Sequence, residues 1–128
     1  MKFDIDCARE ILLTLEAKEN DCSMSFTELN NSLPSYSGNP SLVEYTCFKL
    51  EEAGFITLEL KNNGSGFIER ITDITYQGHQ FIADIRDKDI WNKVKKKASA
   101  VGSFSVKTVS QIAVAVISEM IKNQLISP

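Results

Sequence analysis

The sequence predicts a mainly helical protein with one β-hairpin, an α+β fold. Residues 55–60 alternate apolar and polar side chains from Ile56 on, with the period of two that half-buried strands show, and residues 67–74 return as a second strand. The glycine-rich run 62–66 separates them and is typical of a hairpin turn. Before and after this hairpin, apolar residues recur at helical spacing.

Two helices are predicted before the hairpin region. Either Asp4 or Asp6 can cap a first helix that runs to about Ala17, with one apolar stripe formed by Ile5, Ala8, Ile11, Leu12 and Leu15. Ser25 and Glu28 have the spacing of a capping box, which predicts a short second helix. We expect this helix to turn Phe26, Leu29 and Leu33 inward and to stop at Pro34.

A third helix is predicted between Pro40 and Gly54. Proline is tolerated in the first turn of a helix, and glycine adopts the left-handed conformation that often ends one. Val43, Cys47 and Leu50 lie at i, i+4 and i+7 and define the buried face. Phe55 and Ile56 follow at once, so this helix leads directly into the hairpin.

The C-terminal part is predicted to be helical throughout. Thr75 can cap a fourth helix that carries Phe81, Ile82 and Ile85, and the segment continues through Ile90, Trp91 and Val94. A break at Gly102 precedes a last helix, about Ser105 to Leu125, which is apolar over more than one stripe. We expect that helix to be buried on several sides, against the rest of the chain or against a second copy.

Charge and cysteine content exclude several classes of protein. The net charge is −3, but residues 1–86 carry seven Lys or Arg against fourteen Asp or Glu, and residues 87–128 carry seven against three. Any phosphate-binding surface would therefore have to be local. Three scattered cysteines and one histidine, His79, predict no disulfide framework and no metal site. Without a signal-peptide core or a membrane-spanning run, the expected location is the cytoplasm.

The order helix, helix, helix, hairpin resembles a winged helix-turn-helix domain. Ser41, Val43, Leu50, Gly54 and Ile56 are similar to the recognition-helix segment of winged-helix regulators of the multiple-antibiotic-resistance type. The resemblance implies a winged helix-turn-helix domain over residues 1–74. Residues 75–128 then form a helical extension that packs on this domain and can also dimerise it.

A second resemblance covers nearly the whole chain. Its most specific block is Ile74-Thr-Tyr-x-Gly78-His-x-Phe81, which leads into Ile85-Arg-Asp87 and Trp91-Asn-Lys-Val-Lys95. These residues resemble the domain-of-unknown-function 2513 family of small proteins from Gram-positive bacteria and their prophages. Thr46 departs from the pattern, since a histidine is expected there. The resemblance implies a winged-helix-like fold and a mobile-element setting, and it implies no activity.

Two hypotheses for function remain open. The first is a small DNA-binding transcriptional regulator, in which the third helix and the hairpin contact DNA. The residues for this role are Ser41, Tyr45, Lys49, Lys61, Asn62, Asn63 and Arg70. The second is a protein-interaction module that keeps the winged-helix scaffold without binding DNA. It would use the apolar patch Leu42, Tyr45 and Phe48, because exposed apolar patches mark contact sites.

Both hypotheses allow a protein partner or a homodimer through the C-terminal helices. The lysine cluster Lys93, Lys95, Lys96 and Lys97 is either a phosphate contact or a solvated helix face. We expect no enzyme and no cofactor, because the sequence has no nucleophile, metal-binding or phosphate-loop motif around His79 or the hairpin glycines.

Overall fold

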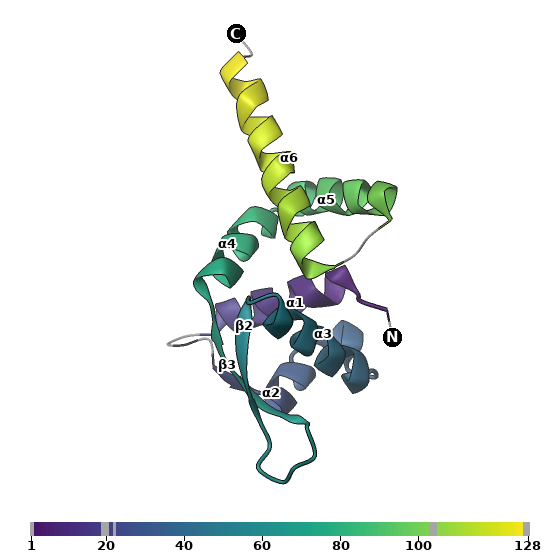
Figure 1. Cartoon of the computed structure of the whole chain (residues 1–128), viewed down its shortest axis with the longest axis vertical. Helices are drawn as coiled ribbons and strands as arrows, with labels where there is room; N and C mark the ends of the chain where they lie inside the picture. Colours follow the sequence, from purple (N-terminus) through teal and green to yellow (C-terminus); the bar gives the residue numbers. More distant parts are fainter. Residues whose placement is uncertain (1, 19–20, 22, 103–104, 127–128) are drawn as a thin grey trace.

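The computed structural model describes residues 2–18, 21, 23–102 and 105–126. Its helices and strands follow the order α1 (Ile5–Ala17), β1 (Met24–Ser25), α2 (Phe26–Asn31), the 3₁₀ turn η1 (Pro34–Tyr36), α3 (Pro40–Glu52), β2 (Ile56–Leu60), β3 (Ile68–Ile74), α4 (Tyr76–Ile85), α5 (Lys88–Val101) and α6 (Val106–Ile126). Figure 1 shows α1, α2, α3 and the sheet as one body, with α4, α5 and α6 stacked at one end of it. The prediction of a mainly helical α+β protein is confirmed.

The sheet has three antiparallel strands in the order β1-β3-β2. The hairpin pairs Ile56 with Ile74 at its base and Leu60 with Ile68 near its tip. The strand β1, in which Met24 pairs with Ile71, was not predicted from the sequence. A two-residue strand is too short to carry an alternating pattern, so only its pairing with β3 defines it.

Local capping signals set the starts of the N-terminal helices. Asp4 is the N-cap of α1, and its Oδ1 accepts a hydrogen bond from the amide of Cys7 at 3.0 Å. Ser25 caps α2 by accepting from the amide of Glu28 at 3.1 Å. The Glu28 carboxylate lies 3.5 Å from Lys18 Nζ. Leu29 and Leu33 are buried as expected, but Phe26 is only half-buried and lines a surface hollow.

The start of α4 docks closely on the root of the hairpin. The Thr75 hydroxyl donates to the carbonyl of Gly54 at 2.6 Å and also accepts from the amide of Gly78 at 3.0 Å. A Cβ at Gly78 would lie 2.2 Å from the carbonyl oxygen of Phe55, so only glycine permits this approach. One turn later Phe81 packs on Phe55, with ring centroids 5.1 Å apart. Threonine, glycine and phenylalanine in this block therefore fix where α4 leaves the sheet.

The predicted continuation of the fourth helix is divided into α4 and α5. Asp87 is the N-cap of α5 and accepts from the amide of Ile90 at 3.0 Å. This cap starts a new helix that buries Trp91, Val94 and Ala98. The break predicted at Gly102 is confirmed, since this glycine ends α5 with φ of 78°.

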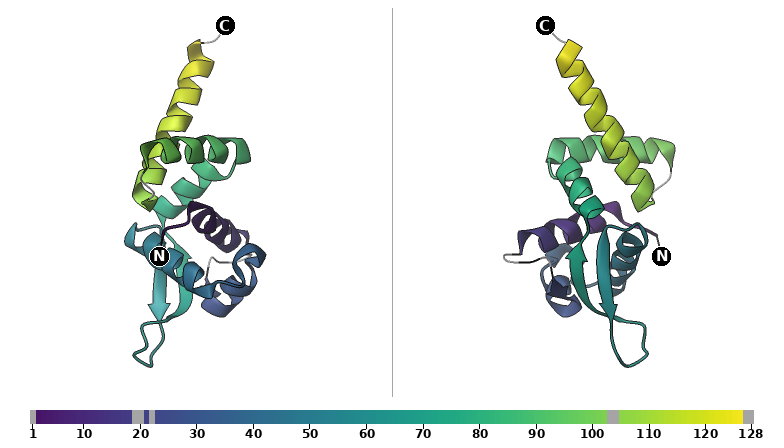
Figure 2. Two further views of the ribbon diagram at one scale, coloured as in Figure 1. Left: turned by 90° about the vertical axis from the view of Figure 1, so that its right-hand side faces the viewer. Right: turned by 60° about the vertical axis from the view of Figure 1, so that its left-hand side comes forward.

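Only one stripe of α6 is buried within the chain. Val106, Val109, Ala113 and Val116 are buried. Val114, Ile121 and Leu125 are exposed by 55%, 53% and 82%. Figures 1 and 2 show the last turns of α6 extending away from the body, at the opposite end of the molecule from the hairpin tip. The expected burial on several sides is therefore not provided by the chain itself.

A single hydrophobic cluster joins the N-terminal helices, the sheet, α4, α5 and the first half of α6. The division into residues 1–74 and 75–128 stays a prediction. None of the helices in the described ranges is long and apolar enough to cross a membrane.

Candidate interaction surface

The outward side of α3 is partly covered by neighbouring segments. Asn39 caps this helix through a hydrogen bond from the amide of Leu42 at 3.3 Å, and Pro40 occupies its first turn. Leu42 and Phe48 are half-buried and pack against the core. Tyr45 is also half-buried, and it lines a hollow of about 400 Å³ together with Phe3 and the first residues of α6. Leu42, Tyr45 and Phe48 are therefore each partly covered by the chain itself, and their role as a partner surface stays a prediction.

Two of the cationic candidates for DNA contact have partners within the chain. Lys49 Nζ lies 3.1 Å from a carboxylate oxygen of Glu52 and 5.3 Å from the centre of the Tyr45 ring. The hydrogen bond to Glu52 raises the pKa of Lys49. Arg70 Nε donates to the Ser23 hydroxyl at 3.0 Å, which holds this guanidinium beside β1.

The remaining DNA candidates lie at the start of α3 and at the hairpin tip. Ser41, Lys61, Asn62 and Asn63 are exposed. The side-chain oxygen of Asn63 accepts from the amide of Ser65 at 3.0 Å and so stabilises the turn. Ser41 and Lys61 line the same surface hollow, which brings one residue from each predicted element together.

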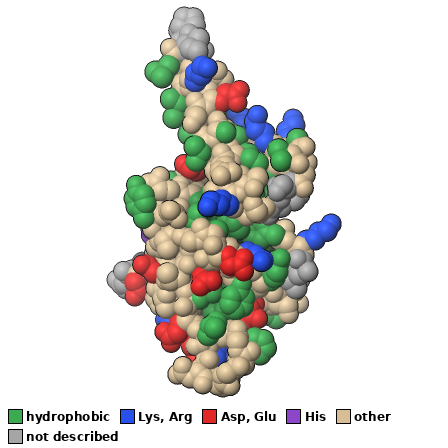
Figure 3. All heavy atoms as spheres, in the orientation of Figure 1, with side chains coloured by type: hydrophobic (Ala, Val, Ile, Leu, Met, Phe, Trp, Pro, Cys, Tyr) green, Lys and Arg blue, Asp and Glu red, His purple; other side chains and the backbone are tan. Residues whose placement is uncertain are grey.

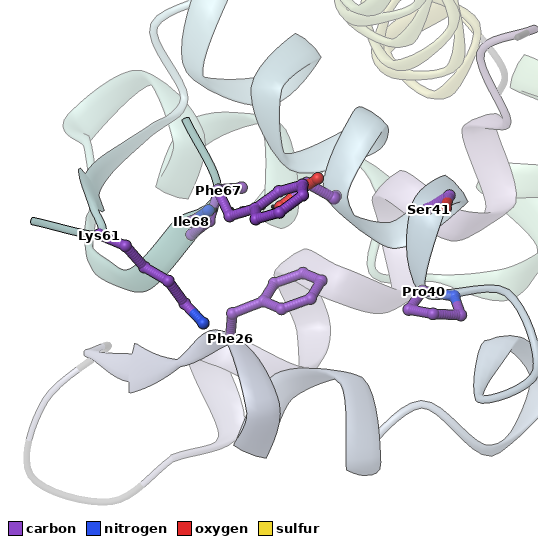
Figure 4. A pocket seen from close by; sticks show the side chains of 7 residues that line it. Phe26, Pro40, Ser41, Lys61, Phe67 and Ile68 are labelled. Carbon is purple, nitrogen blue, oxygen red and sulfur yellow. Dashed lines mark hydrogen bonds between the residues drawn. The ribbon is translucent and has the colours of Figure 1, made fainter. Parts of the chain in front are cut away.

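This hollow, which we call the wing groove, has a volume of about 240 Å³ and is lined by Phe26, Pro40, Ser41, Glu44, Lys61, Phe67 and Ile68. Figure 4 shows the rings of Phe26 and Phe67 on opposite sides of it, with the Lys61 side chain reaching toward Phe26. Phe67 is 56% exposed, an unusual position for a large aromatic side chain. A Glu44 carboxylate oxygen accepts from the amide of Ile68 at 3.3 Å, which ties α3 to the hairpin.

Phe26 and Phe67 were not among the site residues predicted from the sequence. Phe26 belongs to a helix whose pattern predicts burial, and Phe67 was assigned to the second hairpin strand, although it lies just before β3. The only sequence signal was that Phe67 and Ile68 are two consecutive apolar residues, so in an alternating strand one of them must face outward.

The charges around α3 and the hairpin are mostly negative. Glu44, Glu51 and Glu52 lie on α3, and Glu59, Glu69 and Asp73 lie on the hairpin strands. Figure 3 shows most of the acidic side chains on that face over the lower body, and several lysines higher up around α5 and α6. Lys93, Lys96 and Lys97 line a separate hollow with Glu119 and Met120 of α6.

The two cysteines within the described ranges have the environment of core residues. Cys7 and Cys47 are free and fully buried. Burial raises the pKa of the Cys7 thiol to about 11 and raises the pKa of Cys47 as well. Thr46 is buried beside them, and its hydroxyl donates to the carbonyl of Leu42 at 2.7 Å. Among the described residues, no three His, Cys, Asp or Glu side chains are close enough together to hold a metal ion.

Comparison with known proteins places the chain in a family without assigning it an activity. A relative from Haemophilus influenzae (strain ATCC 51907 / DSM 11121 / KW20 / Rd), described as an uncharacterized protein, is 30% identical over 127 residues, which cover 94% of this chain and 99% of the relative. No solved structure matches the chain. The family described as "Hypothetical protein (DUF2513)" matches residues 2–105, a range that includes α1 to α5. The chain belongs to the DUF2513 family.

Proposed function

We propose that this chain is a winged helix-turn-helix protein whose wing groove binds a segment of another protein. The scaffold part of the proposal is supported by topology. Three helices, a hairpin, and a short strand between the first two helices that pairs with β3 give the sheet order β1-β3-β2. One scaffold serves many functions, so the function depends on the chemistry of the wing groove.

The observation that carries the proposal is the chemistry of the wing groove. In a winged helix-turn-helix protein that binds DNA, the second helix of the helix-turn-helix contacts the nucleic acid with its first residues, and the hairpin, or wing, contacts it as well. In this chain the corresponding helix is α3. Here that place holds two aromatic rings and the carboxylate of Glu44. A carboxylate repels phosphates. Aromatic rings that are open to solvent favour contact with an apolar side chain, because the contact removes both from water.

The positive charge of Lys61 indicates which kind of peptide would fit the wing groove. Lys61 is exposed at the edge of the wing groove and offers a cation to the incoming segment. The best complement is an extended peptide that places a leucine or an aromatic side chain between Phe26 and Phe67. An acidic residue next to that side chain would pair with Lys61.

DNA binding is the second candidate function. It is favoured by the exposure of Ser41, Lys61, Asn62 and Asn63, of which Ser41 and Lys61 both line the wing groove. It is disfavoured by the partners of Lys49 and Arg70. Among the described residues, Lys61 is then the one cationic candidate whose side chain makes no hydrogen bond or ion pair.

Selection of a random peptide library on the immobilised protein tests the proposal. We expect enriched peptides with an apolar side chain beside an acidic one, and we expect Phe67→Ala to lose them. The matched control is Tyr76→Ala, because Tyr76 is a 77% exposed aromatic residue on α4 outside the wing groove. Peptides that bind both variants equally well would contradict the proposal.

A mobility-shift titration with duplex DNA at rising salt tests the second candidate. Contacts to phosphates weaken steeply with salt, so genuine binding would fall as salt rises and would fall again in Lys61→Ala. Salt-sensitive duplex binding that depends on Lys61, together with no peptide selection, would replace our proposal with DNA binding.

A further inference from the structure

We propose that α6 pairs antiparallel with α6 of a second copy, and that Leu125 of each copy enters a cleft between α4 and α6 of the other. This inference does not depend on the wing groove, which lies on other elements. It rests on two features that share one face of α6, namely an unpartnered apolar stripe and the cleft at its base.

The unpartnered stripe, which we call the outer stripe, consists of Val114, Ile117, Ile121 and Leu125. The intervals of three, four and four residues keep these side chains on one face of the helix. Ile117 is half-buried, and the other three are exposed by 53% or more. The buried stripe Val106, Val109, Ala113 and Val116 has the same period and lies about 100° around the helix. A helix that keeps one apolar stripe open, after burying another against its own chain, is suited to pair with a further helix.

The cleft has a volume of about 430 Å³ and is lined by Ala53, Phe55, Gln77, Gln80, Phe81, Asp84, Lys107, Ser110, Gln111 and Val114. Its apolar part is the stacked pair Phe55 and Phe81 together with Val114. The space is large enough for a leucine side chain and part of the helix that carries it. Val114 belongs both to the cleft and to the outer stripe, so the two form one continuous apolar track.

The position of the cleft selects the antiparallel arrangement. The cleft lies beside the first turns of α6, and Leu125 lies in the last turn, about 20 Å further along the helix axis than residue 111. An antiparallel partner brings its own Leu125 back to this cleft, whereas a parallel partner brings Leu125 next to Leu125. The antiparallel pair has two-fold symmetry, so both clefts are filled by the same contact.

The cleft also increases the surface area that the dimer would bury, beyond what two crossing helices bury. The outer stripe spans three helical turns, and specific dimers bury about 1,200–2,000 Å². A helix pair of this length covers only part of that area. Insertion of Leu125 adds the walls of two clefts, from α4 and from the turn between α3 and β2.

Charge at the cleft agrees with this arrangement. Asp84 and Lys107 both line the cleft, and burial raises the pKa of Asp84, so a cation that arrives on the Asp84 side would be favoured. Lys122 is exposed one turn before Leu125 and would arrive with it. The acidic residue of α6, Glu119, faces Lys97 of its own chain at 4.0 Å and is directed away from the outer stripe.

The mass of the full chain in solution, measured by light scattering over a wide range of concentration, tests the dimer. We expect a dimer that Leu125→Asp and Ile121→Asp weaken by at least about tenfold in Kd. Both residues are exposed, and circular dichroism will verify that each variant keeps its helices. The matched control is Ala115→Asp, which adds the same charge at an exposed position outside the outer stripe and should leave the mass unchanged.

Cross-linking tests the direction of the pair. Chains carrying Gln111→Cys and chains carrying Leu125→Cys, both with Cys22→Ser, are mixed and treated with a short bis-maleimide. We expect the mixed product to exceed the product from Leu125→Cys alone. A monomer at every concentration, a dimer insensitive to Leu125→Asp, or efficient cross-linking of Leu125→Cys with itself would each overturn the proposal.

Discussion

The indole Nε1 of Trp91 donates a hydrogen bond to Oδ1 of Asp6 across 2.9 Å, which joins α5 to the first turn of α1. Trp91 is among the largest fully buried side chains of the protein, and Lys95 reaches the same carboxylate at 3.1 Å. Eighty-five residues separate the two partners of this hydrogen bond. A single carboxylate near the start of the chain therefore anchors the C-terminal helices.

Removing that carboxylate should destabilise the protein. Asp6→Ala leaves the buried indole N–H without its acceptor, which costs about 1–3 kcal/mol. Chemical denaturation followed by tryptophan fluorescence measures the loss, because Trp91 is the only tryptophan. Asp6→Asn keeps an acceptor oxygen and should lose less. Equal stability of Asp6→Ala and the unmodified protein would show that this hydrogen bond makes no net contribution to the free energy of unfolding.

The same carboxylate predicts a dependence on pH. Burial by itself raises the pKa of Asp6, but hydrogen bonds from Trp91 and Lys95 outweigh it, and the pKa lies below its ordinary value of 3.8. A pKa lowered by folding stabilises the folded state above pH 3.8, and this contribution is lost as the pH falls through the lowered pKa. The difference in stability between the unmodified protein and Asp6→Asn should therefore be constant near neutral pH and shrink in acid.

Gly78→Ala should be among the most damaging single-methyl changes in the chain. The added Cβ would lie 2.2 Å from the carbonyl oxygen of Phe55 and 2.8 Å from a methyl group of Ile74. The backbone must move to relieve such overpacking, at a cost of about 1–3 kcal/mol or more. Thermal unfolding will measure it. Gly38→Ala is the matched control, since nothing lies within 4 Å of its added methyl group, and a comparable loss in both variants would contradict the explanation.

Arg9 should contribute far more to stability than Arg86. Arg9 is buried, and its guanidinium donates to the carbonyls of Ile85 at 3.0 Å and Arg86 at 2.8 Å, at the end of α4. Arg9→Ala should cost about 2–3 kcal/mol, because charged hydrogen bonds and packing on Trp91 are both lost. The Arg86 side chain pairs with Glu16 at the surface, and Arg86→Ala should cost less than about 1 kcal/mol. Chemical denaturation of both variants and of the unmodified protein will show which substitution lowers the free energy of unfolding more.

Cys7 and Cys47 should resist thiol reagents in the folded protein. Both are fully buried, and burial holds the pKa of Cys7 at about 11, so little thiolate forms at pH 8. The Cys22→Ser variant restricts the measurement to these two thiols. We expect slow labelling by a maleimide in buffer and rapid labelling of two thiols in denaturant. Rapid labelling of the folded variant would show that the core around α1 and α3 opens readily.

Local signals explain which elements were predictable. The caps at Asp4, Ser25 and Thr75 and the helix exit at Gly54 act within a few residues, so the sequence is enough to locate them. The strand β1 and the division between α4 and α5 were missed. The first has too few residues for a pattern, and the second depends on Asp87 starting a new helix where the apolar spacing alone continued.

The candidate site was predictable only in part. Ser41 and Lys61 were chosen from the sequence, and they do line one groove. Phe26 and Phe67 were not chosen, because exposure of an aromatic side chain depends on which elements cover it. Lys49 and Arg70 were chosen as DNA contacts, and in the structure their side chains contact Glu52 and Ser23. Residues at a distance in the chain, such as Ser23 and Arg70, meet only after folding.

The sequence by itself determined the fold class, the hairpin, the helix caps at Ser25 and Thr75 and the family, because periodicity, capping and motif spacing are properties of short segments. The tertiary structure decided which faces those segments share. It joined Phe26 to Phe67 across the wing groove, buried Arg9 against the end of α4, and left the outer stripe of α6 open. Burial is a property of neighbours brought together by folding, so no local pattern could supply it.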